Sequence, residues 1–364
     1  MGQTSIDRRF LALVLTAAVF TFLLMIAGNA VRVMNAAQAC PDWPTCYGTW
    51  TPPVGFSLAE PVGMQYTHRI LALLAATLTG IAAVWAFIRY RTQHRSGLVA
   101  ISLLLSAALM LVESLLGSGL VLQSESALLS SLHMAAALVS FGLIIVAVVT
   151  LFNSSAQRLS FSFPFSRLSG VVLAAIFVLL ISGTMVTASG ASQSCAGWPL
   201  CASGLPTSPL GWLAIAHRLI VLAVGGLLTY QFFAAWRSQR SQPVLLPAAT
   251  GAFFLMLGQV LVGAVIATRG FPADLVGLHA ASAAGLWAFQ VVLTISAGLT
   301  TRTTEDESTE AVESLPLVRR LKDFVILSKP IIVLLLLVTT YAGMVVGGKS
   351  IPSLPLTLWT LIGG

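Results

Sequence analysis

The stretch IAGNAVRVMNAAQACPDWPTC, residues 26–46, has a counterpart in ISGTMVTASGASQSCAGWPLC, residues 181–201. Isoleucine, glycine, valine, alanine, glutamine, the Trp-Pro pair and both cysteines coincide at the same spacing. Each copy begins in a long apolar run and ends in a short loop bracketed by two cysteines. Because self-similarity of this kind indicates a repeated structural unit, we expect the fold to contain the same unit twice.

The apolar runs around these loops are long enough to cross a membrane. The 364-residue chain is 57% hydrophobic and only 9% charged, whereas soluble domains carry about a quarter charged residues. A helix needs about 20 apolar residues to span the hydrocarbon layer, where it satisfies its own backbone groups. Spans are predicted at Phe10–Val33, Ile70–Ile88, Gly97–Leu122, Leu128–Phe152, Leu168–Thr187, Trp212–Trp236, Val244–Ala267, Leu275–Leu299 and Phe324–Val346.

The first eight spans form two units of four. THRIL at 67–71 matches AHRLI at 216–220, and LLGSGLVL at 115–122 matches LVGAVIAT at 261–268. An even number of spans per unit makes the units parallel, related by an axis along the membrane normal. We therefore predict an all-α polytopic membrane protein: two tandem four-helix transmembrane bundles related by pseudo-twofold symmetry, plus one extra C-terminal transmembrane helix.

This reading divides the chain into four parts. A polar, charged stretch without an apolar stripe separates the second bundle from the last span and is expected to be a flexible cytoplasmic linker. The predicted parts are the N-terminal bundle 1–155, the C-terminal bundle 156–300, the linker 301–322 and a truncated membrane segment 323–364.

The basic residues predict the orientation of the chain. With the N-terminus in the cytoplasm, fourteen of the 19 lysines and arginines lie in cytoplasmic segments, as the positive-inside rule requires. Both cysteine loops then lie on the outer side of a bacterial cell membrane. The net charge of +7 is explained by topology and membrane lipid, so we assign no nucleic-acid role.

Four histidines lie on even-numbered spans near the outer side, in two equivalent pairs: His68, His133, His217 and His279. His94 lies in an inner loop between arginines and is expected to be solvated. A single buried histidine is more often a packing residue, but ionisable groups inside spans are functional candidates. Two equivalent pairs favour haem, whose iron accepts axial histidines within a helix bundle, whereas zinc or copper would need more ligands.

Other polar residues surround these pairs. Arg69 and Arg218 each follow a histidine, and could bind haem propionates or extend to lipid headgroups. Gln65 lies one turn outward from His68. Glu113 lies in the third span, and Gln259 is its counterpart. An intramembrane carboxylate in only one unit makes the N-terminal bundle chemically different from the C-terminal one.

The cysteines lie in two pairs, Cys40–Cys46 and Cys195–Cys201, each enclosing five residues. Their predicted outer location is oxidising, so small disulfides within each loop are possible. A structural role is favoured for the second pair, while structural and redox roles both stay open for the first.

GNAVRVMNAAQACPDWPTC, the His-Arg pairs, the LLG motif and the later histidines together resemble the heme A synthase family over residues 1–300. That family oxidises the ring D methyl group of heme O to a formyl group. The resemblance implies that His217 and His279 hold a resident heme b, and that His68 and His133 form the heme O site. Gln65 stands where the family usually has a glutamate, so we expect Glu113 to supply the catalytic carboxylate.

The tail DFVILSKPIIVLLLLVTTYAGMVV, residues 323–346, resembles the first span of protoheme IX farnesyltransferase, the enzyme that makes heme O. It contains none of that family's Asp-rich motifs, so an active transferase is excluded for this segment as given. A truncated fusion of consecutive enzymes is expected, and a simple membrane tether is the alternative.

Three other functions fit fewer of these features. A di-haem b-type cytochrome exchanging electrons with quinone would have the same histidines but no need for the cysteine loops. A thiol–disulfide exchanger would leave the histidines unexplained, and a repeat transporter should have broken helices and paired charges. We therefore expect a haem-modifying oxidoreductase with one substrate haem, one electron-passing haem and an electron acceptor such as quinone.

Overall fold

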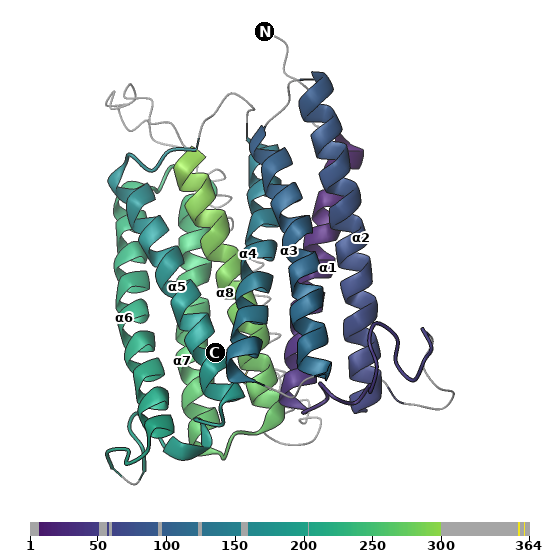
Figure 1. Ribbon diagram of the computed structural model, residues 1–364. Helices are drawn as coiled ribbons and strands as arrows, with labels where there is room; N and C mark the ends of the chain where they lie inside the picture. Colours follow the sequence, from purple (N-terminus) through teal and green to yellow (C-terminus); the bar gives the residue numbers. More distant parts are fainter. Residues whose placement is uncertain are drawn as a thin grey trace. The chain divides into compact units, whose positions relative to one another are not determined.

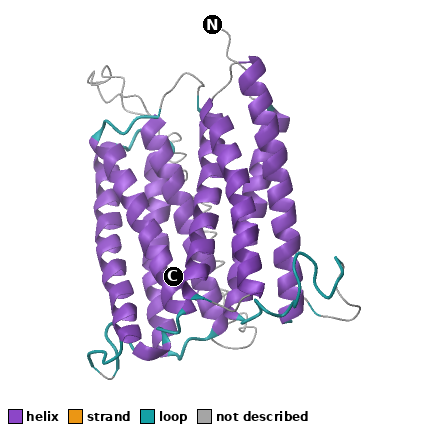
Figure 2. Ribbon diagram, in the orientation of Figure 1, coloured by secondary structure: helices purple, strands orange, loops and turns teal. Residues whose placement is uncertain are grey.

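The computed structural model of the chain describes residues 7–50, 57, 60–93, 97–122, 126–153, 159–202, 204–299, 356 and 360. This part contains eight helices long and apolar enough to cross a membrane and no β-strand, which confirms the all-α polytopic fold (Figures 1 and 2). The helices are α1 Arg8–Val33, α2 Pro61–Gln93, α3 Gly97–Leu122, α4 Ala127–Phe152, α5 Pro164–Ala188, α6 Pro209–Ser238, α7 Leu245–Thr268 and α8 Ala273–Leu299.

The predicted spans and the observed helices differ most at the start of α2. This helix begins at Pro61, whereas the apolar run begins near Ile70. Apolar character marks only the part of a helix that faces lipid, while the helix itself extends to the nearest stop signal. Proline is such a signal and stands in the first turn of α2, α5 and α6. His68 and Arg69 therefore lie inside a helix rather than at its edge.

Several predicted features lie outside the described residues. These are the linker at 301–322, the ninth span at Phe324–Val346, nearly all of the tail 323–364, and His94.

Four helices form the centre of the bundle. α4 and α8 pack against each other and against both α1 and α5, while α2 with α3 and α6 with α7 flank this centre (Figure 1). The contacts α1·α2, α2·α3, α3·α4 and α1·α4 recur as α5·α6, α6·α7, α7·α8 and α5·α8. A duplicated four-helix unit would give this pattern. All eight helices belong to one compact unit, Met1–Thr301.

The largest apolar core lies mainly among the central helices and extends to α6 and α7. Trp287 of α8 is buried there, and its indole N–H donates to the Leu138 carbonyl of α4 at 2.8 Å. The Trp287 ring packs over Gly142, where an added methyl group would lie 3.5 Å from it. Small residues let membrane helices approach closely, so Gly142 allows this contact between the two halves.

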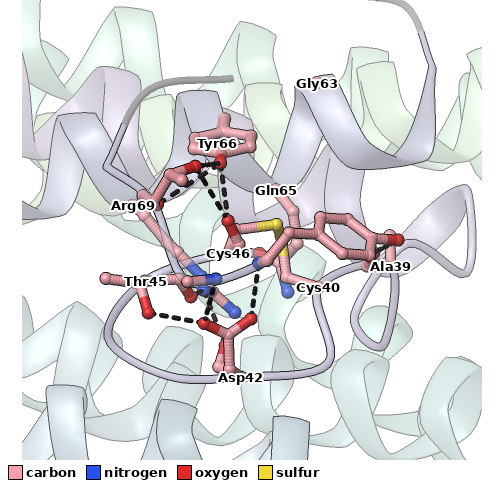
Figure 3. The surroundings of a disulfide bond; sticks show 12 residues. Ala39, Cys40, Asp42, Thr45, Cys46, Gly63, Gln65, Tyr66 and Arg69 are labelled. Carbon is pink, nitrogen blue, oxygen red and sulfur yellow. Dashed lines mark hydrogen bonds between the residues drawn. A yellow bond between two sulfur atoms is a disulfide. The ribbon is translucent and has the colours of Figure 1, made fainter. Parts of the chain in front are cut away.

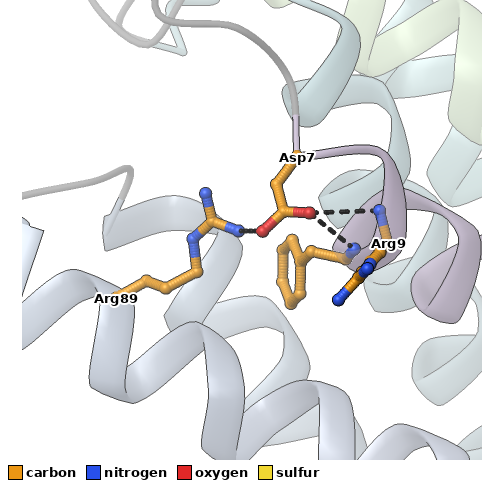
Figure 4. Close-up of polar contacts among 4 residues, drawn as sticks. Asp7, Arg9 and Arg89 are labelled. Atoms are coloured by element: carbon orange, nitrogen blue, oxygen red, sulfur yellow. Dashed lines mark hydrogen bonds and ion pairs between the residues drawn. The ribbon is translucent and has the colours of Figure 1, made fainter.

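The start of α1 is fixed to the end of α2. The Asp7 carboxylate accepts hydrogen bonds from the backbone N–H groups of Arg9 and Phe10, and pairs with Arg89 at 2.7 Å (Figure 4). The guanidinium of Arg89 lies 5.1 Å from the centre of the Phe10 ring. The hydrogen bond from the Phe10 N–H group, together with that from the Arg9 N–H group and the nearby Arg89 charge, holds the pKa of Asp7 below its usual value.

Both cysteine loops, between α1 and α2 and between α5 and α6, lie at the opposite end of the bundle, at the bottom of Figure 1. We call this the cysteine-loop end. The residues expected to carry function lie in the half of the bundle nearest to it.

Replacing Trp287 by phenylalanine removes the only indole donor to Leu138 among the described residues. We expect the Trp287→Phe variant to lose about 1 kcal/mol of unfolding free energy, measured as a lower thermal midpoint in detergent. Trp212→Phe is the control, because Trp212 is half exposed on α6. Equal midpoints for the two variants would contradict a role for this contact between the halves.

Candidate functional site

In the N-terminal half, α1 to α4, two histidines pack against glycines of the preceding helix. A methyl group built at Gly28 of α1 would lie 2.9 Å from Cε1 of His68 on α2. One built at Gly117 of α3 would lie 3.5 Å from Cε1 of His133 on α4. α2 and α4 each pack against both α1 and α3. The two imidazoles therefore enter the same part of the bundle from two different helices.

The C-terminal half, α5 to α8, repeats this arrangement. Gly183 of α5 lies against His217 of α6, where an added methyl group would come within 3.2 Å of the ring. Gly263 of α7 lies against His279 of α8 at 3.4 Å by the same measure. α6 and α8 likewise each pack against both α5 and α7. Each predicted pair is thus brought together, and each ring has a glycine partner that sequence reasoning missed.

His217 and His279 line a cavity of about 940 Å³. Its wall is formed by α5 to α8 with contributions from α1 and α4, and is mostly apolar. Trp198, Pro199 and Leu200 of the second cysteine loop line it at the cysteine-loop end. Mostly apolar walls with a few placed polar groups are typical of cofactor sites.

Hydrogen bonds fix the protonation of His217. Its Nδ1 lies 2.8 Å from the Ser182 hydroxyl, and this hydroxyl lies 2.7 Å from the Leu179 carbonyl. A hydroxyl has one proton, which it donates to the carbonyl, so it accepts from N–H at Nδ1. The lone pair is then on Nε2, as in metal-binding histidines held by an outer hydrogen bond.

A second polar contact joins α7 to α8. The Gln259 amide nitrogen donates to the His279 carbonyl at 3.0 Å and to the Ser282 hydroxyl at 2.6 Å. These bonds hold the helix turn that carries His279. Together with the Ser182 contact, they hold the His217 ring and the backbone that carries His279 in place.

The N-terminal half lacks these contacts. In the repeat, Ala27 stands in place of Ser182, and Ala136 in place of Ser282. Glu113 stands in place of Gln259; the Ser140 hydroxyl of α4 interacts with its carboxyl group. Its Oε1 atom is buried with no hydrogen-bond partner among the described residues. Glu113 therefore has an unsatisfied buried acceptor on α3.

The two cysteine loops are folded in the same way. Disulfides join Cys40 to Cys46 and Cys195 to Cys201, and the Trp-Pro peptide inside each loop is cis. Both loops therefore close as small rings over the bundle end.

The arginines next to the histidines hold these loops. Arg69 donates from Nη1 to the carbonyls of Asp42, at 2.8 Å, and Thr45. Arg218 donates to the carbonyls of Cys195 at 2.7 Å and Pro199 at 3.1 Å. These loop carbonyls differ from the partners expected from the sequence, which were haem propionates and lipid headgroups. Arg218 also lines the cavity, so it can contact a ligand there as well.

The first loop is organised by the Asp42 carboxylate (Figure 3). It accepts from the Thr45 hydroxyl at 2.5 Å and from the backbone N–H groups of Tyr47 and Gly48 at 2.6 and 2.9 Å. The Thr45 hydrogen bond, followed by the backbone bonds, holds the pKa of Asp42 below its ordinary value of 3.8. In the second loop the equivalent residue is Gly197, whose φ of +100° favours glycine.

Gln65 has a structural partner. Its buried amide nitrogen donates to the Ala37 carbonyl at 2.5 Å, which fixes α2 to the chain that leads into the first loop. An ionised carboxylate has no donor for this bond. The amide at position 65 therefore suits a role in holding the loop.

Replacing Asp42 by asparagine leaves one acceptor oxygen and adds a donor, so the first loop loses hydrogen bonds. At near-neutral pH we expect a phosphine to reduce the Cys40–Cys46 disulfide faster in Asp42→Asn than in the parent chain. The extent of reduction is measured by alkylating the free thiols and analysing the peptides by mass spectrometry. Cys195–Cys201 in the same molecule is the control.

The pH dependence of this difference follows from the lowered pKa of Asp42. A depressed pKa means that the carboxylate stabilises the loop above that pKa, and that this contribution is lost as the pH falls through it. The rates at which Cys40–Cys46 is reduced in the two proteins should therefore become equal in strong acid. Equal reduction rates at near-neutral pH would contradict the role given to Asp42.

The chain is similar in sequence to one family of known proteins. The profile of the COX15-CtaA family, described as cytochrome oxidase assembly protein, matches residues 62–291, which include all four paired histidines. The heme A synthase of Exiguobacterium sp. strain AT1b is 28% identical over 262 residues, covering 71% of this chain and 83% of the relative. The heme A synthase of Exiguobacterium sibiricum is 26% identical over 273 residues, covering 72% and 88%. That of Geobacillus thermodenitrificans is 25% identical over 262 residues, covering 69% and 80%.

Proposed function

We propose that this chain, which belongs to the COX15-CtaA family of cytochrome oxidase assembly proteins, is a heme A synthase. It oxidises the ring D methyl group of heme O to the formyl group of heme A. The observation that supports this function best is the pair of equivalent histidine sites, each built from imidazoles packed over glycines.

The two halves hold different haems. The C-terminal half holds heme b, because His217 is fixed with Nε2 available and a large cavity lies beside His279. The N-terminal half holds heme O between His68 and His133, where the serine contacts are absent. Heme b supplies electron-transfer capacity when bound, and the protein supplies ligands, orientation and exclusion of water.

Glu113 is the carboxylate of the N-terminal site. Oxidation of a methyl group to a formyl group releases protons, and a carboxylate with a free oxygen can accept one. Oε1 of Glu113 is such an atom. Gln65, at the position where the family usually has glutamate, is already bound to the Ala37 carbonyl.

The distribution of charge and the resemblances in the sequence support an orientation in the membrane and a set of partners. The N-terminus is cytoplasmic, and the cysteine loops face the outer side of the cell membrane. A quinone is the candidate electron acceptor. A protoheme IX farnesyltransferase supplies heme O, and residues 323–346 of the tail resemble the first membrane span of that enzyme.

Analysis of the extracted haem tests the proposed function directly. Purified chain from cells that also make heme O should contain heme A or its hydroxylated intermediate, identified by chromatography and mass spectrometry. Cells without a heme O supply are the control and should give neither product. A di-haem electron carrier would instead contain only protohaem, at two per chain, under both conditions.

Replacing Glu113 by glutamine keeps its shape but removes the proton acceptor. We expect conversion of heme O to fall at least about 100-fold, since general acid–base groups contribute this much or more. Binding of heme O, followed by its absorption spectrum, should persist. Glu60→Gln is the control, because Glu60 is exposed next to the start of α2. Full turnover by Glu113→Gln would exclude it as the catalytic carboxylate.

A further inference from the structure

Two arginines line the cavity of the C-terminal half: Arg218 of α6 and Arg32 of α1. Among the described residues, no aspartate or glutamate lines it. A haem carries two propionate carboxylates, so two cations on one wall match its charge. Arg32 is notable because its helix belongs to the other half of the duplication.

Arg32 has a special place in the repeat. It lies in the last turn of α1, and its Nη1 atom donates to the Thr187 hydroxyl of α5 at 2.5 Å. Thr187 is the counterpart of Arg32 in the aligned repeat, IAGNAVR over ISGTMVT. Residues that are equivalent under a twofold rotation can touch only near its axis. Arg32 therefore lies where the two halves meet.

The surroundings of Arg32 form the polar end of the cavity. Its Nη2 atom donates to Oδ1 of Asn29 at 3.1 Å, and Asn29, Thr187 and Gln193 line the cavity with it. The second cysteine loop lines the same end, whereas most of the remaining wall is apolar. A haem between His217 and His279 would place its apolar ring edge along that wall and its carboxylates at this end.

We propose that Arg32 reaches across from the N-terminal half and binds one propionate of the haem held by the C-terminal half, while Arg218 binds the other. Arginine suits this role because its planar fork pairs with a carboxylate through charge-assisted hydrogen bonds. The nature of this haem as a resident cofactor rests on the proposed function.

The same contact makes the two haem sites unequal. At the N-terminal site, Arg69 takes the place of Arg218. The residue that takes the place of Arg32 is Thr187 of the C-terminal half, which has no charge. Only one of these two equivalent residues near the axis is an arginine, and it lines the cavity of the C-terminal half. The resident haem thereby gains a second cationic contact that the substrate haem lacks, as expected when one haem stays and the other leaves as product.

Haem titration with a modified ligand tests the role of Arg32. The full chain, carrying His68→Ala so that only the C-terminal pair binds, is purified from haem-limited cells and titrated with protohaem or protohaem dimethyl ester. The ester has the same ring and iron but no carboxylate charge. We expect Arg32→Gln to weaken protohaem binding at least about tenfold, the size of a charge-assisted hydrogen bond, and to leave ester binding unchanged. Arg240→Gln, at the other end of the bundle, is the control and should change neither affinity.

Two outcomes would overturn the inference. If Arg32→Gln weakens protohaem and its ester equally, Arg32 supports the fold and does not bind a carboxylate. If it changes neither affinity, Arg32 makes no contribution to this site. The titration contains no heme O and measures no turnover, so failure of heme A formation would overturn the proposed function separately.

Discussion

Each of the four histidine rings depends on a neighbouring helix that has no side chain at the point of contact. At Gly28 and Gly183 even a methyl group would come within 2.9 and 3.2 Å of the imidazole. The glycines let two helices pack closely while a polar ring lies between them, which is otherwise unfavourable inside a membrane. This contact sets the pairing of α1 with α2, α3 with α4, α5 with α6 and α7 with α8, and it directs the imidazoles into the bundle.

Differences between the repeats then separate the two sites. Ser182 holds His217 and Ser282 holds Gln259, whereas alanines replace both serines in the N-terminal half. Glu113, in the place of Gln259, has a buried Oε1 atom with no hydrogen-bond partner in the part of the chain that the structure describes. The two histidine pairs of one scaffold thus have different polar surroundings, which supports the proposal of a resident haem in one half and a substrate haem in the other. The cysteine loops, held by Arg69 and Arg218, cover the end where both sites begin.

Most of the fold could be predicted from the sequence, because long apolar runs mark membrane helices directly. The start of α2 could not, since its first turns mix apolar and polar residues and only Pro61 marks the boundary. The histidine pairs were predictable from their depth and repetition, but the glycine partners were not, because glycine is common in membrane helices. Alignment of the repeats could have identified Ser182 against Ala27. The loop contacts of Arg69 and Arg218 depend on how each loop folds back, which spacing alone does not specify.

The central claim is that the two histidine pairs hold different haems. The most direct measurement is the type and amount of haem bound by four variants, His68→Ala, His133→Ala, His217→Ala and His279→Ala, purified from cells that make heme O. Loss of protohaem only from the last two, with loss of heme O and its oxidised products from the first two, is the predicted result. Equal loss of protohaem from both pairs would contradict the assignment of one half to a cofactor and the other to a substrate.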